Sequence, residues 1–217
     1  AMVTGYVRRV YNVLVRPYTP RKLAVFNGIA VRGVRLFDAT DTFPNYERPL
    51  IAGIRSRVTP DDTVTVVGGG RGVSSVSAAH RTGPKGSVNT YEGSAERCEL
   101  ATETVDLNGV DDIVEVNHNI VGEAVSLANA SKGATTRPPG ELPACDVLVL
   151  DCEGAEIGIP EQLDQRPRVL IVETHAFLDS PEEDVRATLD ELGYEVVDRG
   201  VEVEEMGVYV LTAVERR

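Results

Sequence analysis

Three glycines at alternate positions, Gly68, Gly70 and Gly72, directly follow an apolar β-branched run over residues 63–67. A glycine has no Cβ atom, so a ligand can touch its backbone, and the helix expected to follow offers free N–H groups and a positive dipole end. Glu92 lies 20 residues beyond Gly72, at the end of the next expected strand, where a carboxylate can accept hydrogen bonds from two ribose hydroxyls. The glycines alone would fit a tight turn equally well. Together with Glu92 they predict an adenosine-containing ligand.

The glycine spacing separates the candidate nucleotides. The dinucleotide fingerprint G-x-G-x-x-G needs a glycine at position 73, where this chain has Val73, so NAD is disfavoured. The phosphate-binding loop of ATP-hydrolysing proteins needs Gly-Lys-Ser/Thr, and no lysine directly follows these glycines. The sequence therefore favours a nucleoside ligand of another kind.

Acidic residues and a histidine follow two later expected strands. Asp151, Glu153 and Glu156 come at and after the end of one strand, and Glu173 and His175 end the next, so we expect them to converge at one edge of the sheet. His175 is the natural general base, and the alternative is a structural histidine hydrogen-bonded at the strand end. Asp151 or Glu153 would instead act as base, contact the cofactor or bind Mg²⁺, although a metal-free site is favoured. Glu156 fits best in the first turn of a short helix.

The third expected strand runs into the sequence NHNIVGE. Asn117 and Asn119 are candidates to hydrogen-bond the edge of an adenine ring. His118 between them should point to the other side, because side chains alternate along a strand. Arg71, inside the glycine loop, is a further candidate to pair with a carboxylate of a ligand, although an exposed loop arginine more often meets only solvent.

Short apolar runs alternate with helix-length segments from residue 62 onward. Strands are expected over residues 63–67, 87–92, 113–116, 146–151 and 169–173, and helices over residues 73–80, 95–107 and 180–192. The runs at 146–151 and 169–173 are apolar through their middle, which is typical of strands buried on both faces of a parallel sheet. Ser180 is the expected N-cap of the last helix. Residues 128–143 indicate a loop. The tail predicts two antiparallel strands at the sheet edge, which completes an open α/β sheet.

The first 57 residues do not follow this alternation, so we expect a basic cap over residues 1–57 and a ligand-binding domain over residues 58–217. The cap should contain a helix over residues 3–15, a turn-rich segment to about Tyr46 and a helix from there to Arg57. Residues 1–37 hold seven basic residues and no acid. We favour packing of this segment on the acidic body or on a second subunit. The alternatives are peripheral docking on an anionic membrane or glycolipid surface and recruitment of an acidic acceptor.

The composition indicates which partners and surroundings suit the protein. The net charge is −12, and residues beyond 37 carry about −19, so the body should repel nucleic acid. Only 3 of the 22 basic residues are lysine and tryptophan is absent, which resembles the profile of proteins from salt-loving archaea. Three cysteines without metal-type spacing indicate reduced thiols. No apolar run reaches the roughly 18 residues of a membrane span. We expect a cytoplasmic protein, and the oligomeric state stays open.

The glycine loop, Glu92 and the C-terminal strand pair resemble the class I S-adenosylmethionine-dependent methyltransferases, over a stretch from about Tyr46 to the end of the chain. The segment LDCEGAE at 150–156 is similar to the D-x-E-G-x-E segment of the FkbM family, and VETH at 172–175 is similar to its E-x-H. The resemblance implies a Rossmann-like class I methyltransferase sheet with helices on both faces and a C-terminal antiparallel hairpin.

The same resemblance implies S-adenosylmethionine as cofactor and transfer of its methyl group to a hydroxyl of a saccharide, glycolipid or related small molecule. In the class, an acid usually stands two residues before the first glycine, where this chain has Val66. Val66 leaves open a non-catalytic nucleoside-binding module. An NAD-dependent sugar-modifying enzyme is a third hypothesis.

Overall fold

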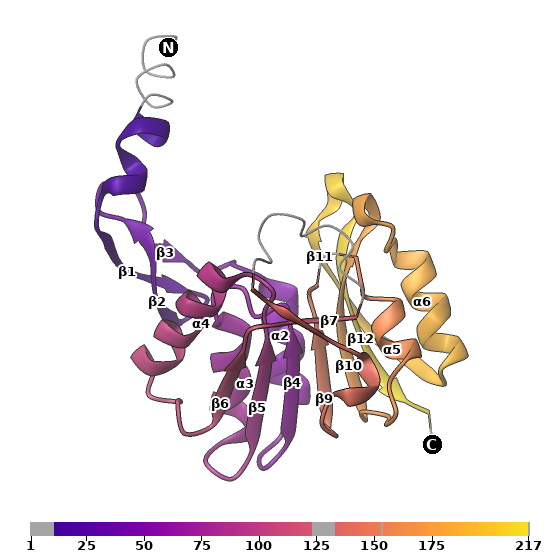
Figure 1. Ribbon diagram of the computed structural model, residues 1–217. Coiled ribbons are helices and arrows are strands. Elements are labelled where there is room, and N and C mark those ends of the chain that lie inside the picture. Colours follow the sequence, from indigo (N-terminus) through magenta and orange to yellow (C-terminus); the bar gives the residue numbers. More distant parts are fainter. Residues whose placement is uncertain (1–10, 123–132, 153, 217) are drawn as a thin grey trace.

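The computed structural model describes residues 11–122, 133–152 and 154–216 (Figure 1). Its centre is a seven-stranded sheet with the order β11-β12-β10-β9-β4-β5-β6. The strands, in that order, are β11 Tyr194–Val203, β12 Val208–Glu215, β10 Val169–His175, β9 Val147–Leu150, β4 Thr63–Val67, β5 Ser87–Tyr91 and β6 Val114–Asn117. The five strands from β10 to β6 are parallel, and β12 runs antiparallel to both of its neighbours. The predicted α/β sheet with an antiparallel edge pair is confirmed.

The central strands are buried on both faces because helices cover both. The helices are α2 Arg48–Arg57, α3 Val73–Thr82, α4 Ala95–Leu107, α5 Gly158–Glu161 and α6 Glu182–Glu191. Along β9, Val147 and Val149 join the hydrophobic cluster formed with α2, α3 and α4, whereas Leu148 and Leu150 join the cluster formed with α5 and α6. This alternation is the two-residue period of a strand, and it explains why the whole run had to be apolar. Among the described residues, no helix combines the length and apolar character needed to cross a bilayer.

The N-terminal segment forms a small sheet that the sequence analysis did not predict. It consists of β1 Arg21–Phe26, β2 Ile29–Arg35 and β3 Thr42–Phe43, in the order β2-β1-β3. Asn27 and Gly28 both have positive φ and close the hairpin between β1 and β2. The expected turn-rich segment is therefore wrong, although Asn-Gly between β-rich runs is the strongest short-range signal for a hairpin.

The rest of the N-terminal expectation is met in part. The small sheet shares one hydrophobic cluster with α2 and the central strands, to which it contributes Phe26, Ile29 and Val31. Helix α2 begins at Arg48, close to the predicted start. Residues 3–10 of the helix expected at 3–15 lie outside the described residues, and residues 11–14 are helical.

Two other local predictions are wrong. Helix α6 has Pro181 as its N-cap and begins at Glu182, because the backbone of Ser180 pairs with that of His175. Part of the expected loop at 128–143 is a strand, β8 Thr135–Arg137, which pairs in parallel with β7 Asn119–Val121. The β7–β8 pairing joins residues 16 positions apart, which local turn signals do not reveal.

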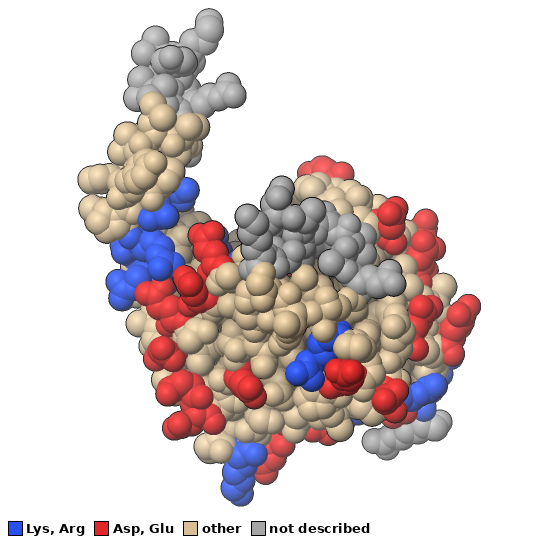
Figure 2. All heavy atoms as spheres, viewed as in Figure 1, with Lys and Arg blue, Asp and Glu red and all other residues tan. Residues whose placement is uncertain are grey.

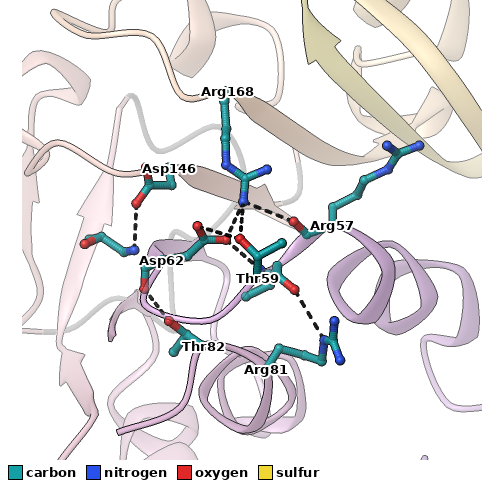
Figure 3. A network of polar contacts seen from close by, with 9 residues as sticks. Arg57, Thr59, Asp62, Arg81, Thr82, Asp146 and Arg168 are labelled. Atoms are coloured by element: carbon teal, nitrogen blue, oxygen red, sulfur yellow. Dashed lines mark hydrogen bonds and ion pairs between the residues drawn. The ribbon is translucent and has the colours of Figure 1, made fainter. Parts of the chain in front are cut away.

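A polar network ties the amino-terminal ends of the parallel strands together (Figure 3). The Asp62 carboxylate, one residue before β4, accepts hydrogen bonds from the Thr59 backbone N–H at 2.7 Å and the Thr59 hydroxyl at 3.1 Å. It also pairs with the guanidinium of Arg168, one residue before β10. Asp146, one residue before β9, accepts a hydrogen bond from the backbone N–H of Thr63 at 2.9 Å. The network therefore holds three strands in register at the edge opposite to their carboxyl ends.

Replacing Asp62 by alanine should lower the free energy of unfolding by about 1–3 kcal/mol, because it leaves the Thr59 backbone N–H and the Arg168 guanidinium without their buried acceptor. Urea unfolding followed by circular dichroism measures the change. The matched control is Asp106→Ala on the exposed side of α4, which should stay within about 0.5 kcal/mol of the wild type. Equal unfolding midpoints for the two variants would show that the network does not stabilise the sheet.

Candidate active site

The glycine loop leaves β4 at its carboxyl end, and its three glycines do different things. All three have positive φ, at 90°, 52° and 80° for Gly68, Gly70 and Gly72. A Cβ atom on Gly68 would lie 1.7 Å from the carbonyl oxygen of Asp151, and one on Gly72 would lie 3.0 Å from that of Ala101. These two glycines therefore let β9 and α4 approach the loop. A Cβ on Gly70 would meet no atom within 4 Å, so Gly70 is the glycine that leaves room for a ligand.

A cavity of about 690 Å³ opens over this loop, within the range of about 300–1,000 Å³ that is usual for ligand sites. Gly68, Gly70, Glu92, Asn119 and Asp151 line it, whereas Gly72, Asn117 and His175 are not among its lining residues. It lies at the carboxyl ends of the parallel strands, where open α/β sheets bind their ligands. Most of the candidates from the sequence thus meet in one cavity.

Glu92 connects the loop to the end of β5. Its side chain is buried, and its Oε2 atom accepts a hydrogen bond from the Gly70 backbone N–H at 2.8 Å. Its Oε1 atom accepts one from the Ser94 N–H, also at 2.8 Å. Each oxygen retains a second lone pair, so the carboxylate shapes the loop and can still accept bonds from a ligand. The sequence predicted the acceptor role and missed the bonds to the loop.

His175 is the centre of a buried acidic cluster beside the cavity. Its Nδ1 atom lies 2.8 Å from Oε1 of Glu156, and its Nε2 atom lies 3.7 Å from Oδ1 of Asp151 and 3.6 Å from Oε1 of Glu173. Burial alone would lower the pKa of His175, but the hydrogen bond to Glu156 and the neighbouring carboxylates raise it to about 10. The raised pKa favours the imidazolium form of His175 at neutral pH, in which neither ring nitrogen has a free lone pair for a substrate proton. The role of His175 as general base stays a prediction.

Asp151 is the member of this cluster that faces the cavity. Burial and the charges of Glu173 and Glu47 raise its pKa well above the usual range of an aspartate. Glu156 lies before α5 and not in its first turn, so the prediction that it occupies a helix start is wrong. Its carboxylate accepts hydrogen bonds from Nδ1 of His175 and from the Gly154 backbone N–H, each at 2.8 Å. Glu153 lies outside the described residues.

The structure places the two predicted asparagines, Asn117 and Asn119, differently relative to the cavity. Asn119 lines the cavity, and its side-chain amide donates hydrogen bonds to the backbone oxygen and the hydroxyl of Thr135, at 3.3 and 2.5 Å. Asn117 ends β6 away from the cavity lining. His118 contacts the carbonyl of Gly93 at 3.1 Å. Contact of either asparagine with adenine stays a prediction.

The N-terminal segment supplies cavity residues that the sequence analysis did not assign. Glu47, just before α2, lines the cavity, and burial with the charges of Glu173 and Glu202 raises its pKa to about 7. Arg35 on β2 lines it too, with Nη1 donating to the Thr19 carbonyl at 2.7 Å. The basic residues that precede the glycine loop were the only sequence signal for a cationic contribution to the cavity. No local pattern shows which of these residues fold back over it.

Several arginines line the cavity. Arg71, from the glycine loop, lies over the ring of Phe26 at 5.2 Å from its centroid, and its Nη1 donates to the Gly33 carbonyl at 3.5 Å. Within the described parts of the chain, neither Arg35 nor Arg71 pairs with a carboxylate. Figure 2 shows the basic group on the N-terminal sheet on a face where acidic side chains are widespread. Both cationic and acidic side chains thus line the cavity.

The strand order, the antiparallel β12 and the glycine loop after β4 form a Rossmann-like fold that solved methyltransferases share. The chain is similar to a ribosomal protein L11 methylase from Lactobacillus delbrueckii subsp. bulgaricus, with a TM-score of 0.56 and 20% identity over 80% of each chain. It is similar to an S-adenosylmethionine-dependent O-methyltransferase from Thermotoga maritima, with a TM-score of 0.54, 19% identity, and coverage of 81% of this chain and 67% of the other. A putative transferase from Pyrococcus horikoshii has a TM-score of 0.58 and 16% identity, with 91% of this chain and 72% of the other covered. No protein-family model and no curated protein sequence matches the chain.

Proposed function

We propose that the protein transfers a methyl group from S-adenosylmethionine to a hydroxyl of a saccharide, glycolipid or related small molecule. The observation that carries the proposal is the cavity in which the bare backbone at Gly70, the carboxylate of Glu92 and the carboxylate of Asp151 meet. Gly70 and Glu92 suit the nucleoside, and Asp151 suits the reacting hydroxyl. The methyltransferase fold supports the choice of cofactor, while the acceptor class rests on the resemblance to the FkbM family.

The reaction is an in-line displacement in which positioning is the main requirement. The bond from the methyl carbon to the sulfonium sulfur breaks, a bond from that carbon to the hydroxyl oxygen forms, and S-adenosylhomocysteine leaves. The hydroxyl proton goes to Asp151, which lines the cavity and whose raised pKa makes it a stronger base than an ordinary aspartate. His175, which does not line the cavity, has Nε2 at 3.7 Å from Oδ1 of Asp151 and acts as a positioning residue for that carboxylate.

The arginines favour an acceptor that carries an acidic group. Arg35 and Arg71 line the cavity with their charges directed to backbone carbonyls and an aromatic ring. A phosphate or carboxylate on a sugar would supply the missing counter-charge. The net charge of −12 argues against RNA as the acceptor, since a polyanion would be repelled by the rest of the surface.

Replacing Glu92 by glutamine should weaken the binding of S-adenosylmethionine by roughly 1–3 kcal/mol, about 5- to 150-fold, because a charge-assisted ribose hydrogen bond is lost. Titration calorimetry with S-adenosylmethionine and S-adenosylhomocysteine measures the change. Glu99→Gln, on an exposed position of α4, is the control and should bind as the wild type does. An unchanged affinity in Glu92→Gln would remove Glu92 from the site.

Transfer itself is tested with methyl-labelled S-adenosylmethionine and a panel of neutral saccharides, acidic saccharides, glycolipids and RNA. Labelling of acidic saccharides or glycolipids is the expected result. Tight cofactor binding with no labelled product would favour the non-catalytic module that Val66 leaves open. Quenching or enhancement of NADH fluorescence, together with no affinity for S-adenosylmethionine, would favour the NAD-dependent hypothesis.

A further inference from the structure

Two neighbouring strands bring three metal-ligating side chains together beside the cavity. Asp151 directly follows β9, and Glu173 and His175 lie two residues apart near the end of β10, so both point to the same face of the sheet. Strands β9 and β10 are paired in parallel up to Leu150 and Val172. One oxygen of each carboxylate and the Nε2 atom of His175 all lie within 4.8 Å of one another. Sheet geometry therefore fixes the position of all three groups.

Their separations fit a shared ion better than hydrogen bonds. Nε2 of His175 lies 3.7 Å from Oδ1 of Asp151 and 3.6 Å from Oε1 of Glu173. Both distances exceed the 2.7–3.2 Å of a hydrogen bond. Ligand atoms placed tetrahedrally at about 2.1 Å from one metal ion are about 3.4 Å apart. Small movements of the side chains would thus complete a coordination sphere.

Glu173 gives a second and independent indication of a missing ligand. The residue is only 7% exposed, and its Oε2 atom is buried with no hydrogen-bond partner in the described part of the chain. A buried acceptor without a partner costs about 1–3 kcal/mol, and more when it is charged. A cation in the cluster would satisfy this oxygen.

The other side of the imidazole ring is held as it is in metal sites. Nδ1 of His175 donates to Oε1 of Glu156 at 2.8 Å, and Glu156 is only 1% exposed and is itself held by the Gly154 N–H. Metal-bound histidines almost always donate their second ring N–H to such an acceptor, which fixes the ring and its tautomer. In this protein, the hydrogen bond from Nδ1 to Glu156 leaves Nε2 of His175 facing Asp151 and Glu173.

We infer that Asp151, Glu173 and His175 bind one divalent first-row transition-metal ion, such as Mn²⁺, Fe²⁺ or Zn²⁺. Carboxylate oxygens together with an imidazole nitrogen suit these ions better than Mg²⁺. The ion replaces the proton on Nε2, which goes to solvent. Asp151 also lines the cavity, so the ion would lie next to a bound acceptor. With Asp151 as its ligand, the ion would take over the activation of the hydroxyl from Asp151, because it lowers the pKa of a hydroxyl that coordinates it. Binding of the ion does not depend on the proposed methyl transfer.

The first test is a titration of the chelator-treated full chain with Mn²⁺, in which electron paramagnetic resonance counts the free ion. One Mn²⁺ per chain should bind, and Glu173→Gln and Asp151→Asn should each weaken binding at least tenfold. Asp106→Asn, an exposed acid on α4, should leave the titration unchanged and so accounts for weak attraction to the acidic surface. Failure of the wild type to bind Mn²⁺, or equal binding by all the folded variants, would overturn the proposal.

The second test identifies the nitrogen ligand in the wild-type protein, so it does not depend on any variant folding. Pulsed electron paramagnetic resonance of the Mn²⁺ complex should show coupling to a directly bound ¹⁴N nucleus. The chain has three histidines, and the other two are His80 and His118. Loss of the coupling in folded His175→Gln, with its persistence in His118→Gln, assigns the ligand. A wild-type complex without ¹⁴N coupling would show that His175 is not a ligand of the ion, which would overturn the assignment of this site.

Discussion

A Gly68→Ala variant is expected to lose about 4 kcal/mol or more of unfolding free energy and all measurable affinity for S-adenosylmethionine. The added Cβ would lie 1.7 Å from the carbonyl oxygen of Asp151, far inside van der Waals contact and against backbone that a rotamer change cannot move. The φ of 90° at Gly68 adds a conformational cost of about 1–3 kcal/mol. Strand β4 must therefore separate from the end of β9, and the cavity floor is lost with it. Urea unfolding and titration calorimetry measure the two effects.

Gly70→Ala is the matched control, because it adds the same methyl group two residues away. No atom lies within 4 Å of the new Cβ, and the φ of 52° is left-handed helical, so the cost to stability is about 1–2 kcal/mol. The variant should fold and bind S-adenosylmethionine about tenfold more weakly, because Gly70 lines the cavity. If the two variants lost equal stability, the close approach of β4 to Asp151 would be wrong. Full cofactor affinity in Gly70→Ala would place the ligand elsewhere.

The sequence predicted the central sheet because a strand buried on both faces needs an uninterrupted run of apolar residues, which is visible in the local sequence. The runs at 146–151 and 169–173 have no polar residue in their middle, and they became β9 and β10. The C-terminal strand pair is also visible in the local sequence, as two β-rich runs joined by a short connection. The hairpin of β1 and β2 has a local signal as well, in Asn27-Gly28, but it lies in a segment that does not follow the strand–helix alternation of the rest of the chain.

The site was predictable to the extent that strand ends determine it. Gly70, Glu92 and Asp151 meet because parallel strands end at one edge. The glycine pattern predicts room for a ligand at position 68, whereas in the structure a Cβ there would meet the backbone of Asp151. Arg35 and Glu47 reach the cavity because β2 packs on α3 and α4 and because α2 packs on α3, and such long-range packing has no signature in one sequence.

The second large effect is expected at Glu156, whose removal would leave His175 buried without its closest partner. Glu156→Ala should lower the unfolding free energy by about 3–5 kcal/mol, the usual cost of breaking a buried ion pair. Glu156→Gln has nearly the same shape and keeps an acceptor for Nδ1, so it should cost less. Urea unfolding in the presence of a chelator measures both, with Glu99→Gln as the exposed control. Equal loss in the alanine and glutamine variants would mean that the volume and the neutral acceptor kept by glutamine contribute nothing, and that the charge of Glu156 carries the whole effect.

The pH dependence of the Glu156→Gln effect separates charge from packing. The pKa of His175 is raised from 6.5 in the unfolded chain to about 10 in the folded metal-free protein, where Glu156, Glu173 and Asp151 face the ring. The stabilisation from this raised pKa is fully present below pH 6.5 and is lost as the pH rises through about 10. Since the Glu156 hydrogen bond is the largest contribution that raises the pKa, the glutamine variant should be most destabilised relative to wild type near pH 6.5 and least near pH 10. A difference that is constant across this range would mean that His175 is already neutral in the folded protein, and that Glu156 acts on it through packing alone.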